Sequence, residues 1–299
     1  MYNKDLYNSI RNELIEKISL LEDKPEENID STIKALWLKA SGKTLSVVKA
    51  SNESLPELNE QQELKLKELI QLRMNNIPLA HITGRQDFMG IELLSDKRAL
   101  IPRKETEILG KKALEISRIT ADSTDDTLVM DVCCGAGNLG LAIATYNPEC
   151  FVYASDISQE AVELTQENID FLFLGQRVEA VQGDMMSAFE TDKYYEKFDL
   201  IVCNPPYIFS SNIPKMKDEI SLNEPAVAFD GGMLGINIIK AFIREAPKFL
   251  KKAGWLAFEV GVGQGPLMRQ LCERTLQFDE IETVADFLGN IRVVSARKI

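Results

Sequence analysis

The tetrapeptide Asn204-Pro205-Pro206-Tyr207 places an amide, two prolines and an aromatic ring directly after the strand-like run Leu200–Cys203. Neither proline has a backbone N–H, so a β-ladder cannot continue through the segment. Each proline also favours extended geometry in the residue before it, which keeps Asn204 out of a helix. Open α/β sheets bind ligands at the carboxyl edges of their strands. The segment is therefore either a ligand-contacting turn or a rigid exit from the strand.

These residues suit methyl transfer to a planar nitrogen, such as an amide or an exocyclic adenine amine. Such a nitrogen is a poor nucleophile because its lone pair is delocalised, and its N–H groups become better donors as it takes the methyl group. The side-chain oxygen of Asn204 and the carbonyl of Pro205 can accept those hydrogens and stabilise the developing charge. The ring of Tyr207 can stack on the flat group and exclude water. Placement, rather than a strong base, would do most of the catalysis.

A glycine loop, GAGNLG at residues 135–140, follows another strand-like run, and Asp156 lies 21 positions after the first glycine. Read literally, the loop matches the GxGxxG pattern of nicotinamide-binding folds, in which glycines let the backbone approach the ligand and the acid accepts ribose hydroxyls. S-adenosylmethionine needs the same features, and its sulfonium and amino groups also favour acceptors such as Asp131. A βα turn without any ligand is the third interpretation.

The order of the motifs favours S-adenosylmethionine over a nicotinamide cofactor. A dehydrogenase needs a polarising acid near the hydride acceptor, and the sequence offers no clear candidate. The order of the motifs along the chain suits methyl transfer. The glycine loop comes first, then the acid for the ribose, then Gly183-Asp184 after a third strand, and finally Asn-Pro-Pro-Tyr after a fourth.

The elements that position these motifs alternate between strands and helices. Such alternation predicts a parallel, doubly wound sheet. Helices are expected between the strands, for example over 158–172 and 236–250. The tail predicts an antiparallel hairpin that closes the sheet, with strands over 281–287 and 291–297. The parallel strands are expected at 127–132, 151–155, 178–182, 198–203 and 255–260.

The first part of the chain has a different character. Apolar residues spaced by three or four predict helices over about 6–21, 29–40 and 59–74, which together suit a small bundle. Pro78 is expected to end helical structure. Between Gly84 and Pro102, two extended segments around a polar turn at 95–97 predict a hairpin that joins two domains.

Composition narrows the class of protein. With 299 residues, 45% hydrophobic and 27% charged, the chain is that of a globular protein large enough for more than one domain. Its first residues show no basic region followed by an apolar stretch, so no signal peptide is expected, and no apolar run reaches transmembrane length. Its single histidine and its five cysteines, which form no CxxC pair, argue against a metal site and fit a reducing cytoplasm. A net charge of −12 disfavours general nucleic-acid binding.

Taken together, the motifs resemble one family, the peptide chain release factor glutamine N5-methyltransferases, over nearly the whole chain. The tetrapeptide alone is shared with adenine N6-methyltransferases of DNA and RNA, so the other segments decide the resemblance. The segments that resemble the family are IPLAHITGRQDFMGIEL, ALIPRKETEIL, DVCCGAGNLGLAIA, ASDISQEAVELTQENI, FDLIVCNPPYI, NEPAVAFDGGMLGINII, LAFEVGVGQG and DFLGNIRVV.

The resemblance implies roles for particular residues. Asn204, Pro205, Pro206 and Tyr207 would be catalytic and would grip the glutamine amide, and Asn204 would also lie beside the cofactor. No metal is implied. The residues implied to bind or border S-adenosylmethionine are Cys133, Cys134, Gly135, Ala136 and Gly137 at the methionine part, Asp156 at the ribose, Asp184 and Met185 at the adenine, and Phe88, Arg103, Glu105, Thr106 and Glu107 near the cofactor or its lid. Packing alone could equally account for Phe88 and Met185, and a surface ion pair for Arg103 with Glu107.

Three departures from the family pattern bear on the cofactor site. Lys104 replaces the usual second proline of a PRPETE-type motif, and Asn138 stands where a hydrophobic or small residue is common. Cys133-Cys134 stands where Gly-Thr is usual, and a cysteine in place of glycine needs a negative φ or some strain. These changes leave room for weaker cofactor binding or for a different amide substrate.

The expected architecture is α/β, with a seven-stranded Rossmann-like methyltransferase domain after a small helical bundle. Residues 1–83 would recruit the substrate, 84–104 would form a hairpin linker, and 105–299 would hold the catalytic domain. The expected function is methylation of the glutamine in the Gly-Gly-Gln motif of class 1 release factors, which would be its protein partners. The alternatives are an adenine-N6 methyltransferase of DNA or RNA, a paralogue that methylates another amide, and an inactive nucleotide-binding scaffold.

Overall fold

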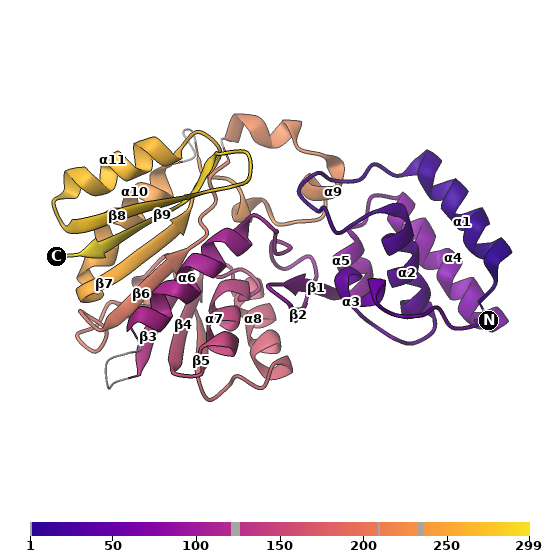
Figure 1. The fold of residues 1–299 in the computed structure, drawn as a ribbon, viewed down its shortest axis with the longest axis horizontal. Coiled ribbons are helices and arrows are strands. Elements are labelled where there is room, and N and C mark those ends of the chain that lie inside the picture. Colours follow the sequence, from indigo (N-terminus) through magenta and orange to yellow (C-terminus); the bar gives the residue numbers. More distant parts are fainter. Residues whose placement is uncertain (1, 121–125, 209, 233–235) are drawn as a thin grey trace. The chain divides into compact units, whose positions relative to one another are not determined.

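The computed structural model describes residues 2–120, 126–208, 210–232 and 236–299. Its chain forms two compact units, here called the helical unit and the sheet unit (Figure 1). The helical unit consists of Met1–Lys97, Ile101–Lys104 and Met216–Glu224. The sheet unit consists of Arg98–Leu100, Glu105–Lys215 and Pro225–Ile299.

The sheet unit is built on one seven-stranded sheet with the order β5-β4-β3-β6-β7-β9-β8. Its first five strands pair in parallel, and β9 pairs antiparallel with both β7 and β8. The order reverses at β3, which has β4 on one side and β6 on the other. The strands are β3 (Thr127–Val132), β4 (Cys150–Asp156), β5 (Val178–Gln182), β6 (Phe198–Cys203), β7 (Leu250–Glu259), β8 (Phe278–Ala285) and β9 (Ile291–Lys298).

This arrangement confirms the predicted doubly wound sheet and its closing hairpin. The strand bounds of β3, β5 and β6 agree with those expected from the sequence. β3 and β6 are short, mainly apolar runs with turn residues after them. The predicted helices over 158–172 and 236–250 correspond to α8 and to α10 with the 3-10 turn that follows it.

Helices cover both faces of the sheet. One core cluster joins Ile201 and Cys203 of β6 to apolar side chains of α10 and α11, whereas α6 packs against α7 and against β6 and β7. Alternate residues of the central strands β3 and β6 thus supply two apolar layers. The helices are α6 (Thr106–Thr120), α7 (Asn138–Tyr146), α8 (Gln159–Phe171), α10 (Asn237–Glu245) and α11 (Gly265–Thr275), with 3-10 turns at Ser187–Phe189, Ser210–Lys215, Ala226–Ala228 and Ala246–Lys248.

The helical unit has its own apolar core around Trp37, whose indole N–H donates to the carbonyl of Pro56 at 2.9 Å. Asparagine or serine side chains cap the first turns of four of its helices, which explains where those helices begin. Its elements are α1 (Lys4–Lys17), α2 (Ile29–Ala40), α3 (Val47–Ser51), α4 (Glu60–Met74), α5 (Leu79–Thr83), β1 (Arg85–Phe88), β2 (Ile91–Leu94) and α9 (Asp218–Ser221).

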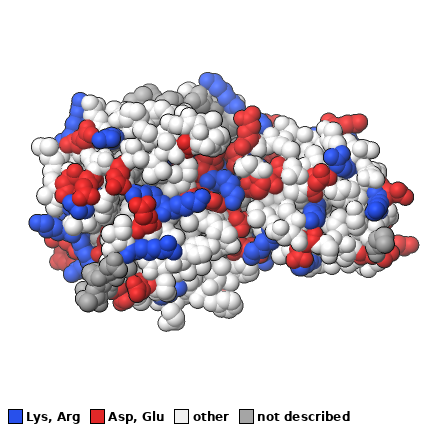
Figure 2. All heavy atoms as spheres, viewed as in Figure 1, with Lys and Arg blue, Asp and Glu red and all other residues white. Residues whose placement is uncertain are grey.

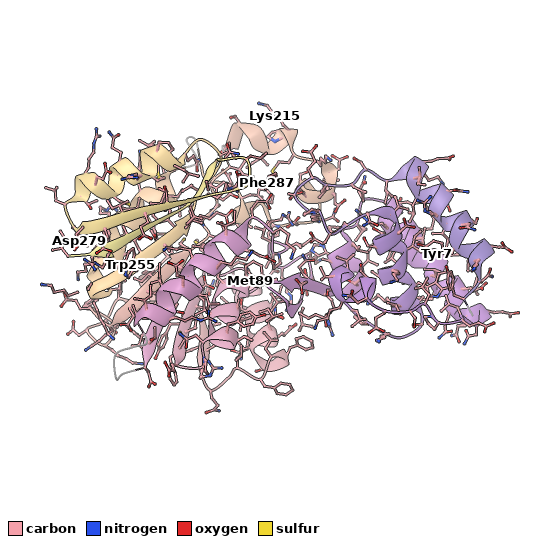
Figure 3. All side chains as sticks on the ribbon, viewed as in Figure 1. Tyr7, Met89, Lys215, Trp255, Asp279 and Phe287 are labelled. Carbon is pink, nitrogen blue, oxygen red and sulfur yellow. The ribbon has the colours of Figure 1, made fainter. Side chains whose placement is uncertain are left out.

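Two local predictions in this unit are wrong. Pro78 does not end helical structure but precedes α5, a position that proline tolerates because the first helical N–H groups need no partner in the helix. The hairpin turn lies at Met89-Gly90 rather than at 95–97 (Figure 3). Both turn residues have positive φ, 51° and 86°, as a two-residue hairpin turn requires.

The segment Met216–Glu224 belongs to the helical unit although the residues on both sides of it belong to the sheet unit. Its Glu219 carboxylate is 4% exposed and pairs with Lys24 at 3.0 Å and Arg73 at 2.7 Å. Glu224 accepts from the backbone N–H of Ile101 at 2.9 Å. The compact units therefore differ from the three consecutive segments expected from the sequence, since one unit takes in both the hairpin and this later segment.

A helix that spans a lipid bilayer needs about 20 predominantly apolar residues. Within the described ranges, no helix combines the length and the apolar character needed to span a membrane.

Candidate active site

The register of the parallel strands brings four functional positions to one edge of the sheet. Val132 on β3 pairs with Ser155 on β4 and with Cys203 on β6, and Cys203 pairs in turn with Phe258 on β7. The next residue on each strand is Cys133, Asp156, Asn204 or Glu259, respectively. All four therefore lie at the carboxyl edge beside the point where the strand order reverses, where open α/β sheets bind their ligands.

The loop 133–137 turns sharply between β3 and α7. Cys133, Gly135 and Gly137 all have positive φ, at 59°, 57° and 81°. Two side chains of α8 hold the loop: the Thr165 hydroxyl donates to the carbonyl of Gly135 at 2.8 Å, and the Asn168 amide donates to the carbonyl of Ala136 at 3.0 Å. The side chains of Cys134 and Ala136 are buried, so these two residues offer only backbone groups to a ligand.

The three glycines of the loop differ in the space around them. A Cβ at Gly135 would meet nothing within 4 Å, so this position faces open space. A Cβ at Gly137 would lie 2.8 Å from Thr165, and one at Gly140 would lie 2.8 Å from Val152. Gly137 and Gly140 are therefore required by packing, and only Gly135 leaves room for a ligand to approach the backbone.

Asp131 is fully buried on β3 beneath this loop. Its Oδ2 accepts the N–H of Gly140 at 2.8 Å, whereas Oδ1 is buried without a partner among the described residues. Burial raises the pKa of Asp131 to about 7, with the N–H of Gly140 acting against it and nearby Asp156 adding to it. A buried carboxylate oxygen without a donor is suited to accept from a bound cation.

Asp156 is tied to the loop by its own hydrogen bonds. Its Oδ2 accepts the N–H of Gly135 and its Oδ1 the N–H of Ser158, each at 2.9 Å. Burial raises the pKa of Asp156, although the amides of Ser158, Gly135 and Ile157 oppose that effect. The two bonds fix the carboxylate beside the glycine loop while each oxygen keeps a lone pair for another donor.

Asp184 and Met185 lie in the turn after β5. The N–H of Gly183 donates to the carbonyl of Asp156 at 2.9 Å, and the Ser155 hydroxyl donates to the carbonyl of Met185 at 2.8 Å. The Asp184 side chain is exposed, and Met185 is half-buried with a φ of 53°. These bonds bring the turn beside Asp156, as the predicted cofactor site requires.

The Asn-Pro-Pro-Tyr segment is anchored at both ends. The Asn204 Nδ2 donates to the Thr106 hydroxyl oxygen at 3.1 Å, and the Tyr207 hydroxyl donates to the Glu259 Oε1 at 2.7 Å. Among the described residues, no donor bonds to the Asn204 Oδ1 or to the carbonyl of Pro205. The two acceptors that the amide-binding hypothesis needs are thus both available.

Two charged residues behind this segment were not singled out in the sequence. Glu259 ends β7 and is 1% exposed, and Arg292 on β9 is 9% exposed. The Arg292 Nη2 donates to the Glu259 Oε1 at 3.3 Å and to the Tyr207 hydroxyl at 3.2 Å. The only signal in the sequence is that each charge interrupts an apolar strand, Leu256–Phe258 before Glu259 and Val293-Val294 after Arg292.

The remaining predicted residues divide between the units. Thr106 and Glu107 open α6 in the sheet unit, where Glu107 lies 3.9 Å from Lys111, and Glu105 belongs to the same unit. Phe88, the last residue of β1, and Arg103 belong to the helical unit.

Arg103 pairs with Asp23 at 3.0 Å and with Glu224 at 2.6 Å. Both partners belong to the helical unit, and a role of Arg103 near the cofactor or its lid stays a prediction. Part of the family-like segment at 223–239, residues 233–235, lies outside the described residues.

Cys133 carries backbone strain that glycine would remove. A residue with a Cβ costs about 1–2 kcal/mol in the left-handed region, and glycine costs about 0.5–1 kcal/mol in unfolded-chain entropy. We therefore expect Cys133→Gly to be about 0.5–1 kcal/mol more stable than Cys133→Ala, measured by urea unfolding. The alanine variant is the matched control because it removes the thiol but keeps the Cβ at φ 59°. Equal stabilities would show that the loop is not strained at this position.

Comparison with known proteins places this chain in a family. A family model described as a methyltransferase domain matches residues 123–287. The chain is 32% identical over 293 residues to a release factor glutamine methyltransferase of Clostridium acetobutylicum, covering 96% of this chain and 98% of that one. It is 34% identical over 241 residues to the protein of the same name from Bacillus cereus, covering 80% and 83% of the two chains.

Solved structures share the fold at low sequence identity. The catalytic domain of hMettl16, in complex with an RNA hairpin, has a TM-score of 0.53 at 13% identity and covers 81% of this chain and 83% of that one. Human methyltransferase 10 domain containing protein has a TM-score of 0.50 at 15% identity, covering 77% and 96%. The two relatives are more than 30% identical to this chain, and the alignments cover most of both sequences. The chain therefore belongs to the release factor glutamine methyltransferase family.

Proposed function

We propose that this protein transfers the methyl group of S-adenosylmethionine to the side-chain amide nitrogen (N5) of the glutamine in the Gly-Gly-Gln motif of class 1 release factors. The observation that carries the proposal is the orientation of the Asn204 side-chain amide. Its Nδ2 is bound to Thr106, which leaves its Oδ1 as an acceptor at the carboxyl edge of the sheet, one strand away from the glycine loop. Family membership adds the substrate that the relatives' names state.

The residues of the sheet unit fit this cofactor. The open space at Gly135 allows a ligand to approach the loop, and the unpartnered Oδ1 of Asp131 would accept from the ammonium group of the methionine part. Asp156 would accept the ribose hydroxyls, with Asp184 and Met185 beside the adenine. When bound, S-adenosylmethionine would supply an electrophilic methyl group on its sulfonium sulfur, which leaves as a neutral thioether.

The substrate amide would be held by the Asn-Pro-Pro-Tyr segment. The Asn204 Oδ1 and the Pro205 carbonyl would accept the two N–H groups, which directs the nitrogen lone pair toward the methyl group. The hydrogen bonds to these acceptors would strengthen as the nitrogen gains positive charge, so they would stabilise the transition state more than the ground state. Burial and then Glu259 raise the pKa of Tyr207 well above its usual range, so its ring stays neutral while it covers the amide.

A direct assay separates this function from its rivals. Purified protein and methyl-labelled cofactor would be mixed with a class 1 release factor, with the same factor carrying Gln→Ala in its Gly-Gly-Gln motif, and with DNA and RNA. We expect label on the intact factor alone. Label on nucleic acid without label on the factor would overturn the proposal. The face shown in Figure 2 has Lys and Arg interspersed with Asp and Glu, and the net charge is −12, which both disfavour docking to phosphates.

Cofactor affinity should depend on pH through Asp131. The carboxyl must be ionised to accept from an ammonium group, and burial raises its pKa to about 7. Lowering the pH through this pKa therefore protonates Asp131 and weakens cofactor binding, by about tenfold between pH 7.5 and pH 6. Calorimetry at both pH values would measure this change. In Asp131→Asn the change should vanish, and a wild-type affinity that does not vary with pH would contradict the assignment.

We assign substrate recruitment to the helical bundle of residues 1–83, because it has an apolar core of its own. We also assign the protein to the cytoplasm, where thiols such as its five free cysteines stay reduced.

A further inference from the structure

The carboxylate of Glu259 is the centre of a buried polar cluster at the carboxyl edge of the sheet. Its Oε1 accepts from the Tyr207 hydroxyl at 2.7 Å and from Arg292 at 3.3 Å, and Arg292 also donates to the Tyr207 hydroxyl at 3.2 Å. The three residues come from β7, from the loop after β6 and from β9. The cluster therefore ties the end of the Asn-Pro-Pro-Tyr segment to two other strands.

The beginning of the segment is held by the hydroxyl of Thr106. Asn204 donates to the Thr106 hydroxyl oxygen at 3.1 Å, and Thr106 is 1% exposed at the start of α6. Thr106 opposes the rise in the pKa of the Glu259 carboxyl, although Glu259 Oε2 is buried without a hydrogen-bond partner among the described residues. Glu259 thus holds Tyr207 by a direct hydrogen bond, whereas its effect on Asn204 would pass through Thr106.

The charge balance of the cluster explains why both charged residues are needed. Burial raises the pKa of Glu259, while Tyr207, Thr106 and Arg292 act in the opposite direction. Arg292 is the only one of those three that carries a charge. A buried ion pair that loses one partner leaves the other uncompensated, so its neighbours rearrange. Loss of either charge would weaken the hold of the cluster on the Tyr207 hydroxyl.

We propose that Glu259 and Arg292 are positioning residues that orient Asn204 and Tyr207 for the substrate amide without touching it. The inference rests on the proposed amide methylation. Holding the Asn204 Nδ2 on Thr106 keeps its Oδ1 as the acceptor, since a flipped amide would present a donor to the substrate's N–H groups. Misplacement of such groups by about 1 Å can lower a rate on the order of 100-fold.

The test compares Glu259→Gln with Asp199→Asn. Glu259→Gln keeps the shape and an acceptor for Tyr207 but removes the charge. Asp199 is a matched control because it lies at the opposite end of β6, where it accepts from the Leu128 N–H and from Lys251, each at 2.9 Å. We expect Glu259→Gln to lower kcat by about 10- to 100-fold with cofactor Kd within about twofold of wild type, and Asp199→Asn to leave both unchanged.

A second measurement does not depend on activity. Hydrogen exchange at the amides of Tyr207 and Ile208 should be about tenfold faster in Glu259→Gln and in Arg292→Met than in wild type, and unchanged in Asp199→Asn. If wild-type protein transfers no methyl group to release factor, the proposed function fails, and exchange alone then decides whether the cluster orders the segment. Wild-type kcat and wild-type exchange in Glu259→Gln would overturn the inference.

Discussion

Replacing Asn204 with alanine should lower kcat for methyl transfer by about two to three orders of magnitude, as expected when one preorganised hydrogen-bonding group is lost. Cofactor affinity should change much less, because the free Oδ1 would face the substrate rather than the cofactor. Steady-state kinetics with release factor, together with calorimetry of cofactor binding, would measure both effects. Wild-type rates in this variant would show that the segment is only a rigid exit from β6.

Asn204→Asp is the sharper form of the same experiment. The carboxylate is nearly isosteric and still accepts, but it has no NH2 group to donate to Thr106. Its charge would also lie close to the sulfonium. We expect activity above that of alanine and below wild type, with altered cofactor binding.

Thr106→Val and Thr106→Ser test the anchor of Asn204, which is the hydrogen bond from its Nδ2 to the Thr106 hydroxyl oxygen. Only serine keeps that hydroxyl. Methylation that falls in the valine variant and persists in the serine variant would assign the anchor to that hydroxyl. Equal rates in valine and wild type would show that the Asn204 amide does not need it.

Replacing Arg73 with methionine should destabilise the helical unit by about 3–5 kcal/mol, because it breaks a buried ion pair and leaves charges uncompensated. Arg73 is 1% exposed and contacts Glu219 at 2.7 Å and Glu27 at 3.3 Å. Removing Glu219 as well, in Arg73→Met with Glu219→Gln, leaves Lys24 to balance Glu27 at 4.0 Å. The double variant should therefore recover much of the lost stability.

The two tryptophans allow this change to be followed in one unit. Trp37 is fully buried in the helical unit, and Trp255 lies on β7 in the sheet unit (Figure 3). In a Trp255→Phe background, fluorescence during urea unfolding reports the helical unit alone. Glu68→Gln is the control, since Glu68 also lies on α4 and its pair with Lys65 is exposed on both sides. An Arg73→Met variant within about 0.5 kcal/mol of the control would contradict the prediction.

Much of the sheet unit was predictable because its signals are local. β6 is a short, mainly apolar run that ends just before Asn204, and proline stops its ladder whatever surrounds it. The glycine loop was recognisable for the same reason, because Gly135 and Gly137 take backbone conformations that few other residues adopt at low cost. Where a local signal was misread, as at Met89-Gly90, a turn with positive φ was occupied by a residue that rarely adopts it.

The conformation of Cys133 and the use of each glycine needed the folded backbone. The sequence allowed either a negative φ or strain at Cys133, and the observed φ of 59° decides for strain. GxGxxG likewise does not tell which glycine faces a ligand. Gly135 faces open space only because Gly137 and Gly140 lie against Thr165 and Val152, which are distant in the chain.

The sequence by itself determined the order of the motifs at the strand ends, the place of the Asn-Pro-Pro-Tyr segment after β6 and the acid that ends β4. Tertiary structure alone decided what supports them. Glu259 and Arg292 meet because β9 inserts antiparallel beside β7, and Glu219 joins Lys24 and Arg73 across nearly 200 and 150 positions of chain. Charges so far apart carry no periodic signal, and they pair only after apolar burial has brought their elements together and removed the water that would otherwise solvate them.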